Sequence, residues 1–130
     1  MRRLLPALLV SVVPFTASCY VLAGAGIGYV VSQQVLPNSV HESQVADDYE
    51  VVWESVQETT EILTDLGVDP TVTQYPRRIQ TEVNSSTVTI DVEAVDLDLT
   101  LIRVSAEKVL GADAATAEQV MSKILERLEA

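Results

Sequence analysis

The chain has 130 residues, of which 19 are acidic and eight are basic, and its formal net charge at pH 7 is −11. A surface this acidic repels phosphate backbones and anionic headgroups, which argues against nucleic-acid binding and against membrane binding through a basic patch. The single cysteine cannot form a disulfide within the chain, so the fold must depend on its hydrophobic core.

The first 18 residues have the organisation of an export signal. Arg2 and Arg3 form a positive start, and residues 4–15 form an uncharged, mostly apolar stretch. Small side chains follow, ending in Ser18 and then Cys19. Because a signal peptidase needs small residues for access to the backbone, we expect residues 1–18 to be a signal peptide that is removed. The remaining chain then carries a net charge of −13, from six basic and 19 acidic residues.

The sequence Phe15-Thr16-Ala17-Ser18-Cys19 resembles a bacterial lipobox, with Ala17 and Ser18 in the two small positions and Thr16 where Leu is usual. The resemblance implies a diacylglycerol thioether on Cys19, cleavage before it, and acylation of the new amine. Two or more acyl chains anchor a protein stably. Tyr20 in place of Asp after the cysteine favours the outer over the inner membrane, with the domain facing the periplasm or the cell exterior.

Two alternatives treat the same segment differently. The stretch Leu4–Val31 lacks charge and is long enough to span a bilayer, so an uncleaved transmembrane anchor is one of them. Pro6 and Pro14 argue against that alternative. In the other, Cys19 is simply an apolar residue without lipid.

Residues 19–38 are expected to join the anchor to the domain. The apolar run Tyr20–Val31 is rich in glycine and alanine, but Tyr29 occupies the last glycine position of a dinucleotide-binding motif. We therefore expect a compact segment near the lipid surface. Ser32–Asn38, with Pro37, has the composition of a linker, and the folded domain is expected over residues 39–130.

The domain begins with a short strand and a helix. Val40–Ala46 alternates weakly and predicts a strand, and Asp47 with Glu50 has capping-box spacing. Gly67 and Pro70 are typical of a helix end. Trp53 is predicted to be a core residue. The apolar stripe of the helix recurs at steps of three and four and consists of Tyr49, Val52, Trp53, Val56, Thr60, Leu63 and Leu66.

Strand patterns dominate the middle of the chain. The predicted strands are Thr71–Tyr75, Ile79–Val83, Thr87–Ala94 and Leu97–Val104, with a turn at residues 84–86. The third alternates as a half-buried antiparallel strand does, and the fourth is apolar on both faces, which favours a central position. Gly111 ends the next connection, and Asp113 is a plausible N-cap for the last helix. Its apolar stripe is Ala117, Val120, Met121, Ile124 and Leu128.

These elements predict an α+β fold. Consecutive strands joined by short turns favour an antiparallel sheet of four to five strands, and two amphipathic helices would cover one of its faces in a two-layer sandwich. Thr, Asp, Glu and Gln side chains on the other face would stay in contact with water.

The order of these features resembles a family of small bacterial lipoproteins catalogued as domain of unknown function 3568. The shared features are the lipobox, an apolar Gly/Ala-rich run, a helix with Val52-Trp53 and Leu66-Gly67, a strand meander, and a C-terminal helix containing residues 124–128. This chain is more acidic than the family. The resemblance implies a fold and a location, because the family has no agreed activity.

No cluster of residues predicts catalysis, a metal site or a cofactor. His41 is the only imidazole, and the carboxylate pairs Asp91/Glu93 and Asp96/Asp98 lack the ligand number that calcium needs. We therefore expect a non-enzymatic protein, anchored to membrane lipid through Cys19, that acts as an interaction or structural module, with an envelope protein as a possible partner along a strand edge.

Three points stay open from the sequence. A small-ligand carrier or sensor, with a pocket between sheet and helices, is the main alternative function, and a carboxylate hydrolase is a third. His41 is a linker or edge residue, or a pH sensor. Arg77-Arg78, the only basic pair after the signal, is a contact point or the flank of a strand.

Overall fold

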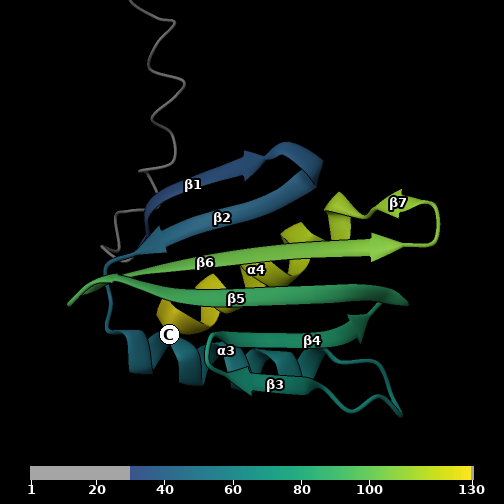
Figure 1. Ribbon diagram of the computed structural model, residues 1–130, viewed down its shortest axis with the longest axis horizontal. Helices are drawn as coiled ribbons and strands as arrows, with labels where there is room; N and C mark the ends of the chain where they lie inside the picture. The colour runs from purple at the N-terminus through teal and green to yellow at the C-terminus, as the bar shows by residue number, and fades with distance from the viewer. Residues whose placement is uncertain (1–29, 130) are drawn as a thin grey trace, which may run out of the picture.

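The computed structural model of the protein describes residues 30–129 (Figure 1). The predicted signal peptide, Cys19 and most of the apolar Gly/Ala-rich segment lie outside these residues. In chain order the elements are β1 (Val30–Leu36), the 3-10 turn η2 (Pro37–Ser39), β2 (Val40–Val45), α3 (Tyr49–Leu63), β3 (Thr71–Gln74), β4 (Arg77–Val83), β5 (Ser86–Asp96), β6 (Leu99–Lys108), β7 (Gly111–Ala112) and α4 (Ala114–Glu129).

The fold is α+β, with two helices and a seven-stranded sheet in the order β1-β2-β6-β5-β4-β3, to which the short β7 adds beside β6. Every pairing is antiparallel. Both helices lie on the same side of the sheet (Figure 1). The α+β class and the antiparallel sheet are confirmed, whereas the expected four to five strands are too few because β1 and β7 were not predicted.

The largest difference from the sequence-based expectation is at the start of the domain. Residues 32–38, expected as a linker, instead form most of β1 and η2. β1 pairs with β2, with Gln34 opposite Glu42 and Val35 opposite His41, and Val30 joins the core. The polar side chains of β1 remain exposed because the strand forms a sheet edge. The folded part therefore begins before Ser39.

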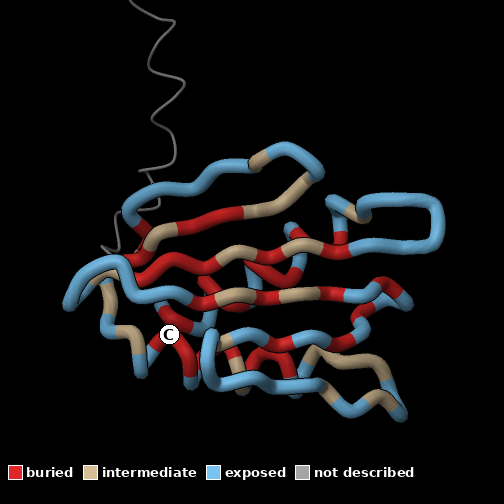
Figure 2. Tube along the Cα trace, in the orientation of Figure 1, coloured by how far each residue is buried: buried red, intermediate tan, exposed pale blue. Residues whose placement is uncertain are grey.

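The core lies between the sheet and the two helices, and the alternation of buried and exposed residues along the strands is visible in Figure 2. The alternation of β5 predicts one apolar face made of Val88, Ile90, Val92 and Ala94. The first three face this core, whereas Ala94 is exposed because it lies beyond the helices' cover. Trp53 is only 4% exposed, which confirms its predicted core position. All five predicted stripe residues of the last helix are buried as well.

Helix α3 begins one residue later and ends earlier than predicted. Asp48, not Asp47, is its N-cap, and accepts a hydrogen bond from the Glu50 amide at 3.1 Å. The helix ends at Leu63 because Thr64 turns to an extended conformation with ψ 137°. Its hydroxyl binds that of Thr81 on β4, and the next amide, that of Asp65, donates to the Glu82 carbonyl instead of to the helix. The side chain of Leu66, predicted to continue the stripe, is consequently fully exposed.

The two predicted hairpins are present. Asn84 and Ser85 both have positive φ, 54° and 65°, as the two central residues of a type I′ turn require. In the second hairpin the turn includes Leu97, and β6 starts at Leu99 rather than at Leu97. β6 lies between β2 and β5, which confirms its predicted central position, and Leu101 is buried on the face away from the helices.

Candidate functional site

The face of the sheet away from the helices carries a row of polar side chains that crosses five strands. One residue from each strand contributes, and neighbours lie directly opposite one another in the pairing of the sheet. From β1 to β4 the row consists of Gln34, Glu42, Arg103, Asp91 and Arg78. We call this row the polar ladder. Its four charged members alternate in sign, so each carboxylate lies beside an arginine.

Glu42 is the most buried member of the polar ladder, with 8% of the residue exposed. Its carboxylate accepts hydrogen bonds from the Gln34 amide and from Arg103 Nε, the latter at 2.7 Å. These two hydrogen bonds, that of Gln34 first, lower the pKa of Glu42 below its ordinary value, although burial opposes the shift. The carboxylate is therefore held ionised at neutral pH and in one orientation.

The remaining pairs of this face are more exposed. Arg78 Nε lies 2.6 Å from Asp91 Oδ1, and Arg103 Nη1 lies 3.8 Å from Glu93. The hydrogen bond with Asp91 raises the pKa of Arg78. A shallow hollow of about 190 Å³ lies over this end of the row. Its lining residues are Pro76, Arg77, Arg78, Asp91, Val92, Glu93 and Arg103. The face of the sheet away from the helices, called the open face below, is thus a polar surface whose side chains are held by ion pairs.

Arg77, the other arginine of the Arg77-Arg78 pair, has a different environment. Arg77 forms two hydrogen bonds with the carboxylate of Glu50 on α3, at 3.0 and 3.2 Å. Its guanidinium also lies over the rings of Tyr49 and Trp53, with 4.5 and 5.5 Å to the ring centroids. The Glu50 hydrogen bonds raise the pKa of Arg77. Arg77 therefore joins the start of α3 to β4, and of the two sequence-based alternatives its position fits a strand flank better than a free contact point.

Every lysine and arginine in residues 30–129 pairs with a carboxylate. The six cations engage seven carboxylates, in pairs that include Lys108–Asp113, Lys123–Glu126 and Arg127–Glu58. Twelve of the 19 carboxylates have no cationic partner in this part of the chain. The surface therefore offers hydrogen-bond acceptors with negative charge in excess, and no unneutralised cation for an anionic ligand.

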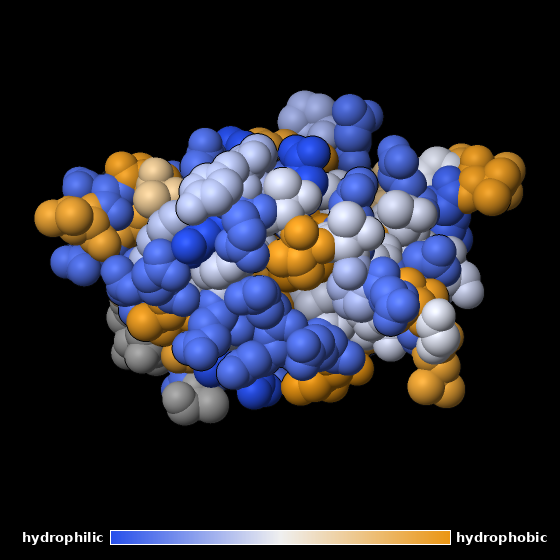
Figure 3. Space-filling model, turned by 60° about the horizontal axis from the view of Figure 1, so that its bottom comes forward, coloured by the Kyte–Doolittle hydropathy of each residue, from blue (hydrophilic) through white to orange (hydrophobic). Residues whose placement is uncertain are grey.

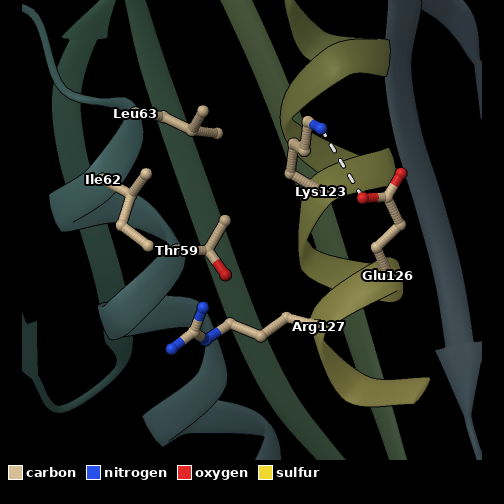
Figure 4. A pocket seen from close by; sticks show the side chains of 6 residues that line it. All are labelled: Thr59, Ile62, Leu63, Lys123, Glu126 and Arg127. Atoms are coloured by element: carbon tan, nitrogen blue, oxygen red, sulfur yellow. Dashed lines mark ion pairs between the residues drawn. The ribbon is translucent and has the colours of Figure 1, made fainter. Parts of the chain in front are cut away.

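Two grooves lie between α3 and α4. The first, of about 350 Å³, is lined by Thr59, Ile62 and Leu63 of α3, which face Lys123, Glu126 and Arg127 of α4 (Figure 4). Arg127 reaches Glu58 at 3.0 Å. Glu58 and Arg127 line the second groove, so this ion pair connects α3 with α4 there. A wall with apolar side chains and a charged rim is a feature of many ligand sites, but both grooves are open to solvent.

A smaller hollow lies between α3 and the β3–β4 edge. It bears on the alternative function of a small-ligand carrier, which requires a pocket between sheet and helices. It has about 180 Å³ and is lined by residues that include Val72 and Ile79. Pockets for small ligands usually measure about 300–1,000 Å³. The volume of the hollow therefore lies below the range of typical small-ligand pockets.

The predicted carboxylate pairs occupy two places. Asp91 and Glu93 lie on β5 beside arginines of the open face, whereas Asp96 and Asp98 lie at the turn between β5 and β6. Among residues 30–129 there is no group of three or more His, Cys, Asp or Glu side chains placed to hold a metal ion.

His41 lies on β2 opposite Val104, and it is half-buried. Its Nδ1 atom is buried and has no hydrogen-bond partner among the described residues. Among residues 30–129 no carboxylate forms an ion pair with His41. Cys19, the one predicted site residue, lies outside the described residues.

Hydrophobic side chains are scattered on the surface. On the side shown in Figure 3 they form separate patches within a mostly hydrophilic surface. Fully exposed examples lie in connections, such as Leu66 after α3 and Val109 and Leu110 between β6 and β7. None of the helices within residues 30–129 has the length and apolar character needed to cross a membrane.

Sequence reasoning missed the polar ladder. Glu42 and Arg103 are 61 positions apart, and only the pairing of β2 with β6 brings them together. The available signal was the alternation of β6, in which Arg103 interrupts an apolar stretch. Comparison with known proteins adds no further constraint, because no family model, no curated protein and no solved structure matches the chain.

Proposed function

We propose that this protein is a lipid-anchored module of the bacterial cell envelope that acts by binding a partner rather than by catalysis. The observation that carries the proposal is the lipobox ending in Cys19, which precedes β1 by only ten residues. A chain of that length spans at most about 40 Å when fully extended. Acylation of Cys19 would therefore hold the folded part close to the membrane surface, with the outer membrane favoured by Tyr20.

The arrangement of the open face supports a binding role. Its polar side chains are fixed by one another through the polar ladder, so little side-chain freedom would be lost when a partner docks. The excess of carboxylates favours a neutral or cationic partner over an anionic one. We also propose that the chain is related to the small bacterial lipoproteins of unknown function that it resembles, which have the same order of lipobox, helix and meander.

The test is the intact mass of the native protein extracted from membranes. We expect a chain that begins at Cys19 and carries the added mass of a diacylglycerol and an N-acyl group. A Cys19→Ser variant should lose this mass and the membrane association. Cys19→Ala serves as a second, matched control without a hydroxyl.

Two outcomes would contradict the anchor. One is a native product that keeps Arg2 and Arg3, and the other is a chain that starts at Cys19 without lipid mass. A Cys19→Ser protein that remains in the membrane at full length would instead support the uncleaved transmembrane anchor.

A further inference from the structure

The two edges of the sheet differ in how they are protected. β3 is an edge strand of four residues, with Pro70 immediately before it and Pro76 two residues after it. Short strands and prolines are common devices that prevent an edge from pairing with another chain. β1, at the opposite edge, has seven residues and contains neither proline nor charge.

The chemistry of β1 suits pairing with another strand. A bulge follows Val30, and from Ser32 to Leu36 the strand pairs regularly with β2. No described element pairs with its outer edge. Val31 is 50% and Val35 is 62% exposed. The outer edge therefore presents unpaired backbone groups together with apolar and uncharged polar side chains.

The charge of the protein restricts which surfaces of two copies can meet. With twelve carboxylates lacking a cationic partner in residues 30–129, most faces of one copy repel those of another. Val30–Val40 is the longest stretch without a charged residue in the described part of the chain. The nearest carboxylate on β2, Glu42, is already neutralised by Arg103. β1 is therefore the edge at which two copies can approach with least repulsion.

We propose that β1 is a homodimer interface, at which it pairs antiparallel with β1 of a second copy. A two-fold axis through the strand pair makes the contact self-complementary, since the same backbone groups and side chains occur on both sides. The two sheets join into one, with all four helices on the same side. The contact does not require acylated Cys19, but anchoring on one membrane raises the effective concentration of the copies.

Single-cysteine crosslinking in membranes containing the full-length protein tests the pairing. Cysteines are placed at positions 32, 33, 34 and 35 of β1, and Thr73→Cys on β3 is the matched edge control. The β1 residue nearest the two-fold axis lies directly opposite the same residue of the second chain. A residue two positions away lies about 13 Å from its copy, beyond the reach of a disulfide at about 7 Å between Cα atoms.

We expect disulfide-linked dimers at one or two adjacent β1 positions, with yield falling on both sides, and none with Thr73→Cys. Equal yields at all five positions, no dimer at any β1 position, or crosslinks only to a different protein would each overturn the proposal. A disulfide dimer of the unaltered chain would show that Cys19 is a free thiol, which contradicts the proposed anchor. The β1 series is then repeated with Cys19→Ser.

A charge variant provides the second measurement. Val35→Glu adds a negative charge to each side of the proposed contact, and it should lower the yield of the best crosslinking position among 32, 33 and 34 at least about fivefold. Val35→Gln introduces a side chain of nearly the same shape as glutamate but without the charge, and it should keep most of the crosslinking yield. Thermal unfolding of both variants checks that the fold is intact, and equal yields from the two would overturn the pairing.

Discussion

At the level of single residues, the Asp113 carboxylate accepts three hydrogen bonds. Its Oδ2 atom accepts hydrogen bonds from the hydroxyls of Ser86 at 2.6 Å and Thr116 at 2.7 Å, and its Oδ1 atom accepts one from the Thr116 amide at 3.3 Å. It thereby caps α4, as predicted, and also ties the start of β5 to that helix. These bonds, that of Ser86 first, lower the pKa of Asp113 to about 2.

Asp113→Asn is expected to destabilise the protein in a pH-dependent way. Because the pKa of Asp113 in the folded state lies below the ordinary value of about 3.9, its ionised form stabilises the fold above that value and loses this effect as the pH falls toward 2. The unfolding temperature of the variant should be lower at pH 7, and the gap should narrow below pH 4. Asp98→Asn, in the β5–β6 turn, is the control and should show little change at any pH.

At the level of elements, the polar ladder links five strands through pairs that differ in burial. Arg103 is the partner of the nearly buried Glu42, whereas Arg78 pairs with Asp91 in a setting where both side chains are a third to a half exposed. Removing one member of a pair costs most when the remaining charge is shielded from water. The two arginines therefore provide a matched comparison within one row.

Arg103→Ala should lower the free energy of unfolding by about 1–2 kcal/mol, because it leaves the carboxylate of Glu42 without its cation. Arg78→Ala should cost about 0.5 kcal/mol or less, as exposed pairs do. Urea denaturation at pH 7 measures both. Since the pKa of Glu42 is lowered in the fold, the Arg103→Ala deficit should shrink as Glu42 is protonated at acidic pH. Equal costs for the two variants would contradict the assigned difference in burial.

At the level of the whole molecule, electrostatic repulsion works against the fold. All six cations in residues 30–129 are already paired, so the net charge is spread over carboxylates that have no cation nearby. Screening acts over about 10 Å at 0.1 M salt and about 3 Å at 1 M. Such repulsion is therefore sensitive to ionic strength.

The unfolding temperature at pH 7 should rise as sodium chloride is increased from about 0.01 M to about 0.5 M, because repulsion among carboxylates is screened more than the short ion pairs. Near the isoelectric point of about 4.2 the same salt series should have much less effect. Calorimetry across both series checks this. A fall with salt at pH 7 would mean that the ion pairs outweigh the repulsion.

The sequence predicts those parts of the fold that depend on local pattern. The stripe of α4, the core position of Trp53 and the turn at Asn84-Ser85 follow from periodicity and turn chemistry, and all three are confirmed. β1 was missed because Ser32, Gln33 and Gln34 are polar on both faces, which is possible only for an edge strand. The polar ladder was missed because its members meet through long-range pairing, which local patterns do not encode.

The end of α3 and the position of Leu66 also depend on distant contacts. Thr64 binds Thr81 on β4, and the Asp65 amide donates to the Glu82 carbonyl, so the chain leaves the helix to follow the sheet. Gly67 has positive φ, 84°, as its residue type suggested, but it lies in the connection four residues past the helix. The predicted stop at Gly67 is therefore wrong, because α3 already ends at Leu63 with Thr64 as its C-cap.

The turn between β4 and β5 is clamped from three directions. The amides of Asn84 and Ser85 donate to the Asp65 carboxylate, the Asn84 side chain donates to Gln119 on α4, and Lys108 on β6 donates to the Asn84 carbonyl. Sliding β5 along β4 by one residue would turn its core side chains toward water. Here such a slip would also detach the tip from the segment that follows α3, from α4 and from a third strand. The register of this hairpin is therefore fixed by contacts with other parts of the chain as well as by the pairing of β4 with β5.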